Sequence, residues 1–138
     1  MNDNPLPGTW ALVSVEHFAP EGTRLPFGPN PKGYMMFTAM HMLTVLMEDG
    51  RPNLEVGDLL AGDVGTASDA ELAAAFNSAM AFGGRYDLHE DAVHIHLDVG
   101  TYPNWSGTTQ VRPYDLTDGL LALYPPGWKV VFRRIDET

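Results

Sequence analysis

The chain has 138 residues, of which 44% are hydrophobic and 10% aromatic, and it contains no cysteine. This size and composition are typical of one globular domain, so we assign residues 1–138 to a single domain. Eighteen acidic residues against eight basic ones give a formal net charge of −10, which disfavours nucleic-acid binding. The lack of cysteine excludes disulfides, thiolate metal sites and cysteine nucleophiles.

Residues 1–5 have neither the basic nor the apolar stretch of a signal peptide. No apolar run approaches the roughly 18 residues that a membrane-spanning helix needs. We therefore expect a cytoplasmic protein that does not contact a membrane.

The first half of the chain is predicted to form three strands. Residues 9–18, 33–38 and 41–48 are rich in β-branched, aromatic and other apolar side chains. A loop dense in proline and glycine separates the first two segments, and a tight turn at residues 39–40 joins the last two.

One helix is predicted over residues 68–82. Ser68 and Glu71 have the spacing of a capping box, and apolar residues follow at helical spacing from Leu72 onward. Gly83 and Gly84 are expected to end this helix. We expect it to lie against the rest of the domain or across one end of it, as a lid or a plug.

The second half returns to strand patterns, which are separated by turn residues. The predicted strands are residues 85–88, 92–99, 108–116, 120–124 and 128–134. Because only one helix interrupts the strands, the chain is predicted to be all-β. We expect an eight-stranded up-and-down antiparallel barrel, with one short α-helix between strands three and four. A barrel of this size holds one small ligand or a filled core.

Gly8-Thr9-Trp10 resembles the Gly-X-Trp signature of lipocalins. The pieces GTWALVSVE, GPNPKGYMMFT, GRYDL, YPNWSGTTQVR and FRR, in this order, are similar almost end to end to the bacterial and fungal lipocalin-like domain family. The resemblance implies a barrel with an internal cavity. It also implies that Trp10 plugs one end, with Arg133 or Arg134 lying across the indole. The family does not imply one activity, because related barrels include binders, isomerases and cyclases.

His94, His96 and Asp98 share one face of a predicted strand, and apolar residues take the other. Two orientations are open: the histidines face solvent, or they line a cavity. In the second case His96 could move a proton, with His41 as a further candidate. Arg112, on the same face of the next strand as Gln110, could stabilise an oxyanion there. Alternatively, Arg112 ties its strand to an acidic neighbour such as Asp98.

A metal site could be built from the His94–His96 pair with His41 or His89 and Asp98. A second ordered set of ligands is not apparent in the sequence. We therefore predict no metal site and no cofactor.

Aromatic, methionine and amide side chains are the candidates for ligand binding, because rings and thioethers adapt to flat apolar molecules. The predicted ligand-binding residues are Tyr34, Met36, Met47, Phe82, Tyr102, Trp105, Gln110 and Tyr124. Each residue taken alone is better explained as part of the core, except in the loop at residues 102–105, which has no core to fill.

Three functions follow. The first is a non-catalytic binder of a small hydrophobic or aromatic molecule in the central cavity. The second is a cofactor-independent isomerase or cyclase of a natural-product pathway, with His96 or His41 as the acid–base group and Arg112 and a tyrosine holding the oxyanion. The third is a stress or interaction protein with a solid barrel. The sequence leaves the oligomeric state open.

Overall fold

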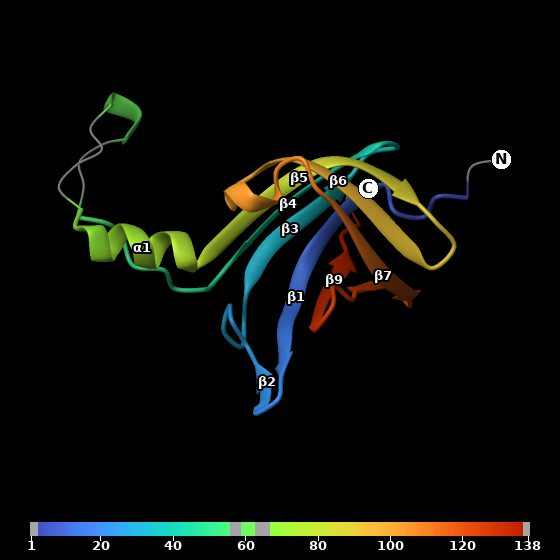
Figure 1. The fold of residues 1–138 in the computed structure, drawn as a ribbon, viewed down its shortest axis with the longest axis horizontal. Helices are drawn as coiled ribbons and strands as arrows, with labels where there is room; N and C mark the ends of the chain where they lie inside the picture. Colours follow the sequence, from blue (N-terminus) through green and yellow to red (C-terminus); the bar gives the residue numbers. More distant parts are fainter. Residues whose placement is uncertain (1–2, 56–58, 63–66, 137–138) are drawn as a thin grey trace.

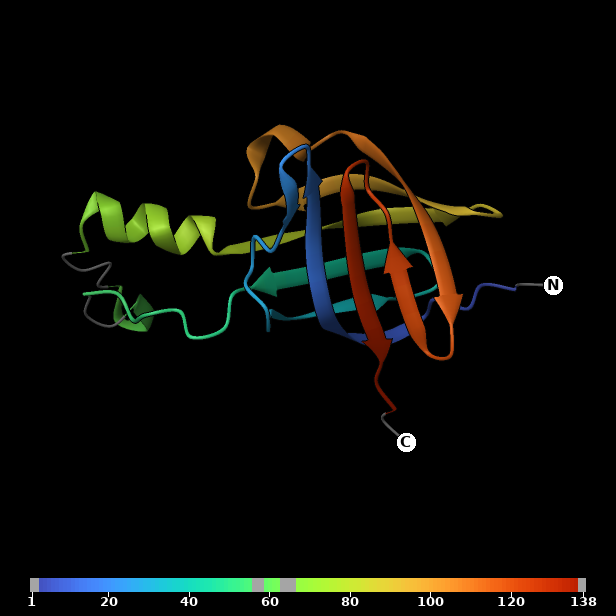
Figure 2. The same cartoon turned by 90° about the horizontal axis from the view of Figure 1, so that it is seen from below.

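The strands of this protein pair in chain order and close into a barrel (Figures 1 and 2). The computed structural model describes residues 3–55, 59–62 and 67–136. The strands are β1 (Gly8–Ala19), β2 (Gly22–Arg24), β3 (Lys32–Phe37), β4 (His41–Met47), β5 (Ala79–Leu88), β6 (Ala92–Gly100), β7 (Thr109–Thr117), β8 (Leu120–Leu123) and β9 (Trp128–Arg134). The helices are α1 (Asp69–Asn77) and the short 3-10 turns η1 (Leu59–Ala61) and η2 (Pro103–Trp105).

Every strand pairing is antiparallel, and β9 returns to pair with β1. The closing register runs from Trp10 opposite Arg134 to His17 opposite Trp128, with a bulge after Leu12. β1 and β3 to β9 therefore form the predicted eight-stranded up-and-down barrel. Closure removes the exposed edges that would otherwise pair with other chains.

Two details of the predicted strand order are corrected. The loop rich in proline and glycine contains a short strand, β2, which pairs only with the end of β1. With β2 counted, α1 lies between β4 and β5 rather than between strands three and four.

The predicted helix is also too long. The capping box is present, with Ser68 and Glu71 each accepting a hydrogen bond from the backbone of the other, but α1 ends at Asn77 and β5 begins at Ala79. The glycine pair lies inside β5, where the backbones come very close: a Cβ on Gly84 would lie 2.0 Å from the carbonyl oxygen of His96. β4 pairs with residues 79–85 of β5 and β6 with residues 82–88, and this pairing outweighs the local helical pattern.

Helix α1 is neither a lid nor a plug. It continues outward from β5 and projects from the barrel in both views (Figures 1 and 2). None of its residues is buried. It contacts the start of β5 and the segment after β4, where Arg51 Nη2 donates to the carbonyl oxygen of Ala75 at 2.8 Å.

One end of the barrel is closed around Trp10, whose side chain is fully buried. Its indole N–H donates to the carbonyl oxygen of Leu6 at 2.9 Å. The Cζ of Arg134 lies 4.2 Å from the centre of the Trp10 ring, and Nη1 donates to the carbonyl oxygen of Pro7 at 3.1 Å. Arg134 is therefore the C-terminal arginine that covers the indole, whereas Arg133 pairs with Ala11 and its side chain is exposed.

Candidate functional site

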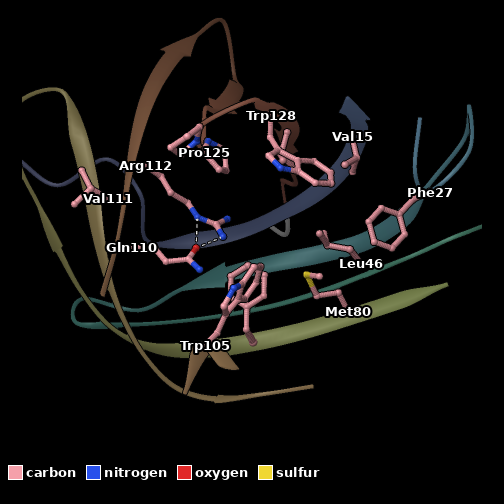
Figure 3. Close-up of a pocket in the computed structure, with 13 residues that line it drawn as sticks. Val15, Phe27, Leu46, Met80, Trp105, Gln110, Val111, Arg112, Pro125 and Trp128 are labelled. Atoms are coloured by element: carbon pink, nitrogen blue, oxygen red, sulfur yellow. Dashed lines mark hydrogen bonds between the residues drawn. The ribbon is translucent and has the colours of Figure 1, made fainter. Parts of the chain in front are cut away.

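A cavity of about 560 Å³ opens at the end of the barrel opposite Trp10. This volume lies within the range of small-molecule sites. Strands β1, β4, β5, β7 and β9 and three loops contribute to its wall, which is almost wholly apolar (Figure 3). The lining residues are Val15, Phe27, Leu46, Met80, Phe82, Trp105, Gln110, Val111, Arg112, Pro125, Pro126, Trp128 and Val130.

The polar side chains of this wall come from β7. Gln110 is paired with Ile95 and Arg112 with Val93, and both of these β6 residues are fully buried. Because directly paired residues point to the same side of a sheet, Gln110 and Arg112 face the barrel interior. The predicted common face of β7 therefore lies inside.

Arg112 is 6% exposed. Its Nε and Nη2 donate to Oε1 of Gln110 at 3.1 and 2.5 Å. Its Cζ lies 4.9 Å from the ring centre of Phe82 and 6.0 Å from that of Trp105. No ion pair among the described residues includes Arg112. Burial without a carboxylate partner disfavours the charged form and lowers the pKa of Arg112 to about 10.

Aromatic rings form much of the remaining wall. Trp105 lies in η2, and its ring meets Phe82 edge-on with 5.4 Å between ring centres. Tyr102 packs edge-on against the same indole, also with 5.4 Å between ring centres. Figure 3 shows Trp128 and Phe27 across the cavity from Trp105. A flat molecule would therefore meet rings on opposite sides.

Of the predicted ligand-binding residues, Phe82, Trp105 and Gln110 line this cavity, together with the predicted Arg112. Tyr102 supports Trp105 without lining the cavity. Tyr124 also stays off the wall: it precedes the lining Pro125, and its ring lies 6.0 Å from Nζ of Lys129.

Three predicted ligand-binding residues lie on the outer face of the barrel, which corrects their placement. Tyr34 and Met36 of β3 are 56% and 52% exposed. Met47 of β4 lies outside the cavity wall, and its sulfur accepts from Arg51 Nη1 at 3.8 Å. The alternate positions Met35 and Leu46 are the buried ones, because successive side chains of a strand point to opposite faces.

The predicted meeting of His96 with Arg112 is wrong. The side chain of His96 is 45% exposed on the outer face, where Nε2 lies 2.7 Å from Asp87 Oδ2 and Nδ1 lies 2.9 Å from Thr109 Oγ1. This contact lowers the pKa of Asp87. His41 is exposed at the start of β4 and does not line the cavity. The apolar face of β6 packs inward because burying it removes more apolar surface from water.

Several lining residues were missed by the sequence analysis. Trp128 and Val130 share one face of β9 with the buried Phe132, so the same period of two that marks β7 could have identified them. Phe27, Pro125 and Pro126 lie in loops. Nothing in the local pattern of a loop indicates that it folds over a cavity.

Among the described residues, no helix is both long and apolar enough to cross a membrane. In the same part of the chain, no three histidine, aspartate or glutamate side chains are grouped so that they could share a metal ion.

Known proteins resemble this chain in sequence and in fold. The chain is 31% identical over 90 residues to a protein of Aspergillus oryzae named 4'-hydroxy-3'-methoxypropiophenone carrier protein ppsC, a match that covers 59% of this chain and 77% of that protein. A crystal structure of a lipocalin-like protein from Bacteroides uniformis has a TM-score of 0.54 at 17% identity, covering 96% of this chain and all of that one.

A second crystal structure, of a protein from Bacteroides eggerthii, has a TM-score of 0.52, also at 17% identity, and covers 94% of this chain and 99% of that one. At this identity the two structures support the fold alone. The sequence evidence is more specific, because residues 7–130 match the profile of the lipocalin-like domain family. Together with the closed barrel and the Trp10–Arg134 contact, this match shows that the chain belongs to the lipocalin-like domain family.

Proposed function

We propose that this protein binds a small aromatic molecule in the cavity at the open end of its barrel. The observation that carries the proposal is an apolar, ring-lined space of about 560 Å³ with one polar group, the Arg112–Gln110 pair, in its wall. Ligand sites have this composition, because apolar surface supplies affinity and a few polar atoms fix orientation.

The relative from Aspergillus oryzae supports this proposal. Its name describes a carrier of an aromatic ketone with hydroxyl and methoxy substituents. A molecule of that kind has a flat apolar body and oxygen atoms at its edges. Those features complement rings such as Trp105 and Trp128, and the donors of Arg112.

The composition of the wall favours binding over catalysis. An isomerase or cyclase needs a group that exchanges a proton near neutral pH. The described lining residues offer no imidazole, carboxylate, hydroxyl or thiol side chain. Because His41 and His96 lie outside the cavity, the acid–base step of that alternative has no side chain in the wall to perform it, and we do not propose it.

The test is a calorimetric and thermal-shift titration with a panel of substituted acetophenones and naphthalenes. A ligand at about 100 times its Kd stabilises the folded state by about 2.7 kcal/mol, which raises Tm by several degrees. Two of the three tryptophans line the cavity, so quenching of their fluorescence is a parallel signal.

A matched pair of variants locates the site. Val15→Trp introduces an indole into the cavity and is expected to weaken binding at least about tenfold by occupying ligand space. Val45→Trp makes the same substitution on the outer face, where Val45 is exposed, and should leave affinity unchanged. If no member of the panel binds, or if both variants bind like the wild type, the proposal is wrong.

A further inference from the structure

The polar end of the cavity offers hydrogen-bond donors and almost no acceptors. A guanidinium carries five N–H groups, and Arg112 uses one from Nε and one from Nη2 on the same oxygen of Gln110. Both N–H groups of Nη1 and one of Nη2 remain. With its oxygen engaged, the Gln110 amide also presents only N–H groups. The indoles of Trp105 and Trp128 are donors as well, so the described side chains give a ligand nothing but donors, apart from the weakly accepting sulfur of Met80.

The free edge of the guanidinium faces the cavity. Among the described residues, no fully enclosed side-chain nitrogen or oxygen lacks a hydrogen-bond partner. Nη1 of Arg112 makes no hydrogen bond within that part of the chain, so it is accessible from the cavity. Figure 3 shows the guanidinium beside Gln110, above Trp105 and turned toward the space enclosed by the lining residues.

The described part of the chain places no carboxylate in the cavity wall as a counter-ion. A buried cation is costly unless a carboxylate or an equivalent anion pairs with it. Arg112 is the one titratable side chain among the described lining residues. With a pKa of about 10 it stays charged at neutral pH despite its burial. The described residues contact the Arg112 guanidinium only through neutral groups, which are one amide oxygen and two ring faces.

We propose that the cavity selects its aromatic ligand as an oxyanion, which completes the charge pair of Arg112 through the Nη1–Nη2 edge of the guanidinium. This inference rests on the proposed binding function and adds the charge state of the ligand. An aryl carboxylate fits that edge with two oxygens. A phenolate whose ring bears a para carbonyl shares the required chemistry, because its charge is delocalised and its pKa is lowered toward neutrality.

The net charge of the molecule opposes the approach of anions. With a formal net charge of −10, the surface repels negatively charged solutes at long range. A preference for an anionic over a neutral ligand of the same shape therefore reports the interior of the cavity rather than a general affinity of this protein for anions.

The experiment compares 2-naphthoate with 2-naphthamide, which has the same ring and nearly the same shape but no charge. Calorimetry at pH 7 should show naphthoate binding about 10- to 100-fold more tightly, the range expected for a charge-assisted hydrogen-bonded pair. In Arg112→Met the preference should fall to within about twofold. Naphthamide binding by the same variant shows that the cavity is intact.

Two further variants sharpen the comparison. Gln110→Glu places a carboxylate beside the guanidinium, so it should abolish the preference for naphthoate and retain naphthamide binding. Arg85→Met removes an exposed arginine of β5 and changes net charge as Arg112→Met does. It should leave both affinities as in the wild type.

A pH titration separates the two oxyanion sources. If a phenolate is accepted, the affinity for 4'-hydroxyacetophenone should rise as pH passes upward through the pKa of its hydroxyl, in wild type but not in Arg112→Met. The affinity for naphthoate should not change over that interval, because its carboxylate is already ionised. If the affinity for 4'-hydroxyacetophenone does not change with pH, the oxyanion that the site accepts is a carboxylate and not a phenolate.

The outcomes are distinct. Naphthamide binding as tightly as naphthoate in wild type, or Arg112→Met keeping the preference, would overturn the oxyanion inference and leave the binding function in place. Binding of neither probe would overturn both.

Discussion

The buried guanidinium predicts that Arg112→Met makes the free protein more stable while removing its preference for anions. Arg112 contacts no acidic side chain among the described residues, and burial lowers its pKa from the ordinary value of arginine to about 10. Methionine replaces the apolar stem of the side chain and has no charge to desolvate. Under the proposed function, the wild-type residue therefore serves ligand binding at the expense of folding stability.

The magnitude follows from the pKa. The lowered pKa corresponds to a cost of about 3 kcal/mol for keeping the guanidinium charged in the folded state at pH 7. Methionine loses the guanidinium–ring contacts, worth about 0.5 to 2 kcal/mol, and the bond to Gln110, worth about 1 kcal/mol. The net expectation is that the free energy of unfolding rises by about 1 kcal/mol, or that Tm rises by about 3 to 5 °C.

Urea denaturation followed by circular dichroism measures this difference. The pH dependence gives an independent check of its origin. Between about pH 10 and the ordinary pKa of arginine, the unfolded wild type binds more protons than the folded one, so wild-type stability rises with pH relative to Arg112→Met. The difference in the free energy of unfolding between Arg112→Met and the wild type should therefore begin to shrink above about pH 10. A variant destabilised by more than about 1 kcal/mol at pH 7 would refute the reasoning.

Three further predictions concern the wall, the sheet and the outer face. Trp105→Leu should weaken the binding of aromatic ligands about tenfold, as measured by calorimetry, because it removes a stacking surface and a ring contact of Arg112. Unchanged affinity would exclude Trp105 from the site. Gly84→Ala should lower the free energy of unfolding, measured in urea, by more than about 2 kcal/mol, because the added Cβ would lie 2.0 Å from the carbonyl oxygen of His96. A smaller loss would mean that the strands can separate locally. His96→Ala should leave ligand affinity unchanged, because His96 contacts Asp87 outside the barrel, and a clear loss would contradict that placement.

Much of the fold was accessible from local patterns. Turn residues separated the strands, and an alternation of apolar and polar positions along residues 92–99 and 108–116 defined two faces for each strand. The resemblance to lipocalins, rather than a local pattern, indicated that Trp10 and a C-terminal arginine close the barrel. The sequence could not choose between Arg133 and Arg134, because a shift of one residue in strand register exchanges the two faces.

The placement of ligand-binding residues depended on tertiary structure. Along β3 and β4 both faces are apolar, so the sequence gives no signal for which of Tyr34 and Met35 points inward. Pairing and closure put Met35 inside and leave Tyr34 exposed. The secondary structure at Phe82 also could not be predicted from local sequence. The residues around Phe82 have a helical pattern, but pairing with β4 and β6 holds it in a strand.

The sequence by itself determined the eight barrel strands, the capping box of the helix and the common face of Gln110 and Arg112, because these depend on neighbours within a few residues. Only the tertiary structure decided that this face lines a cavity while the histidine face of β6 meets water. The reason is that alternation along a strand separates two faces, whereas the inner one is chosen by the closure of the whole barrel, which buries the larger apolar surface.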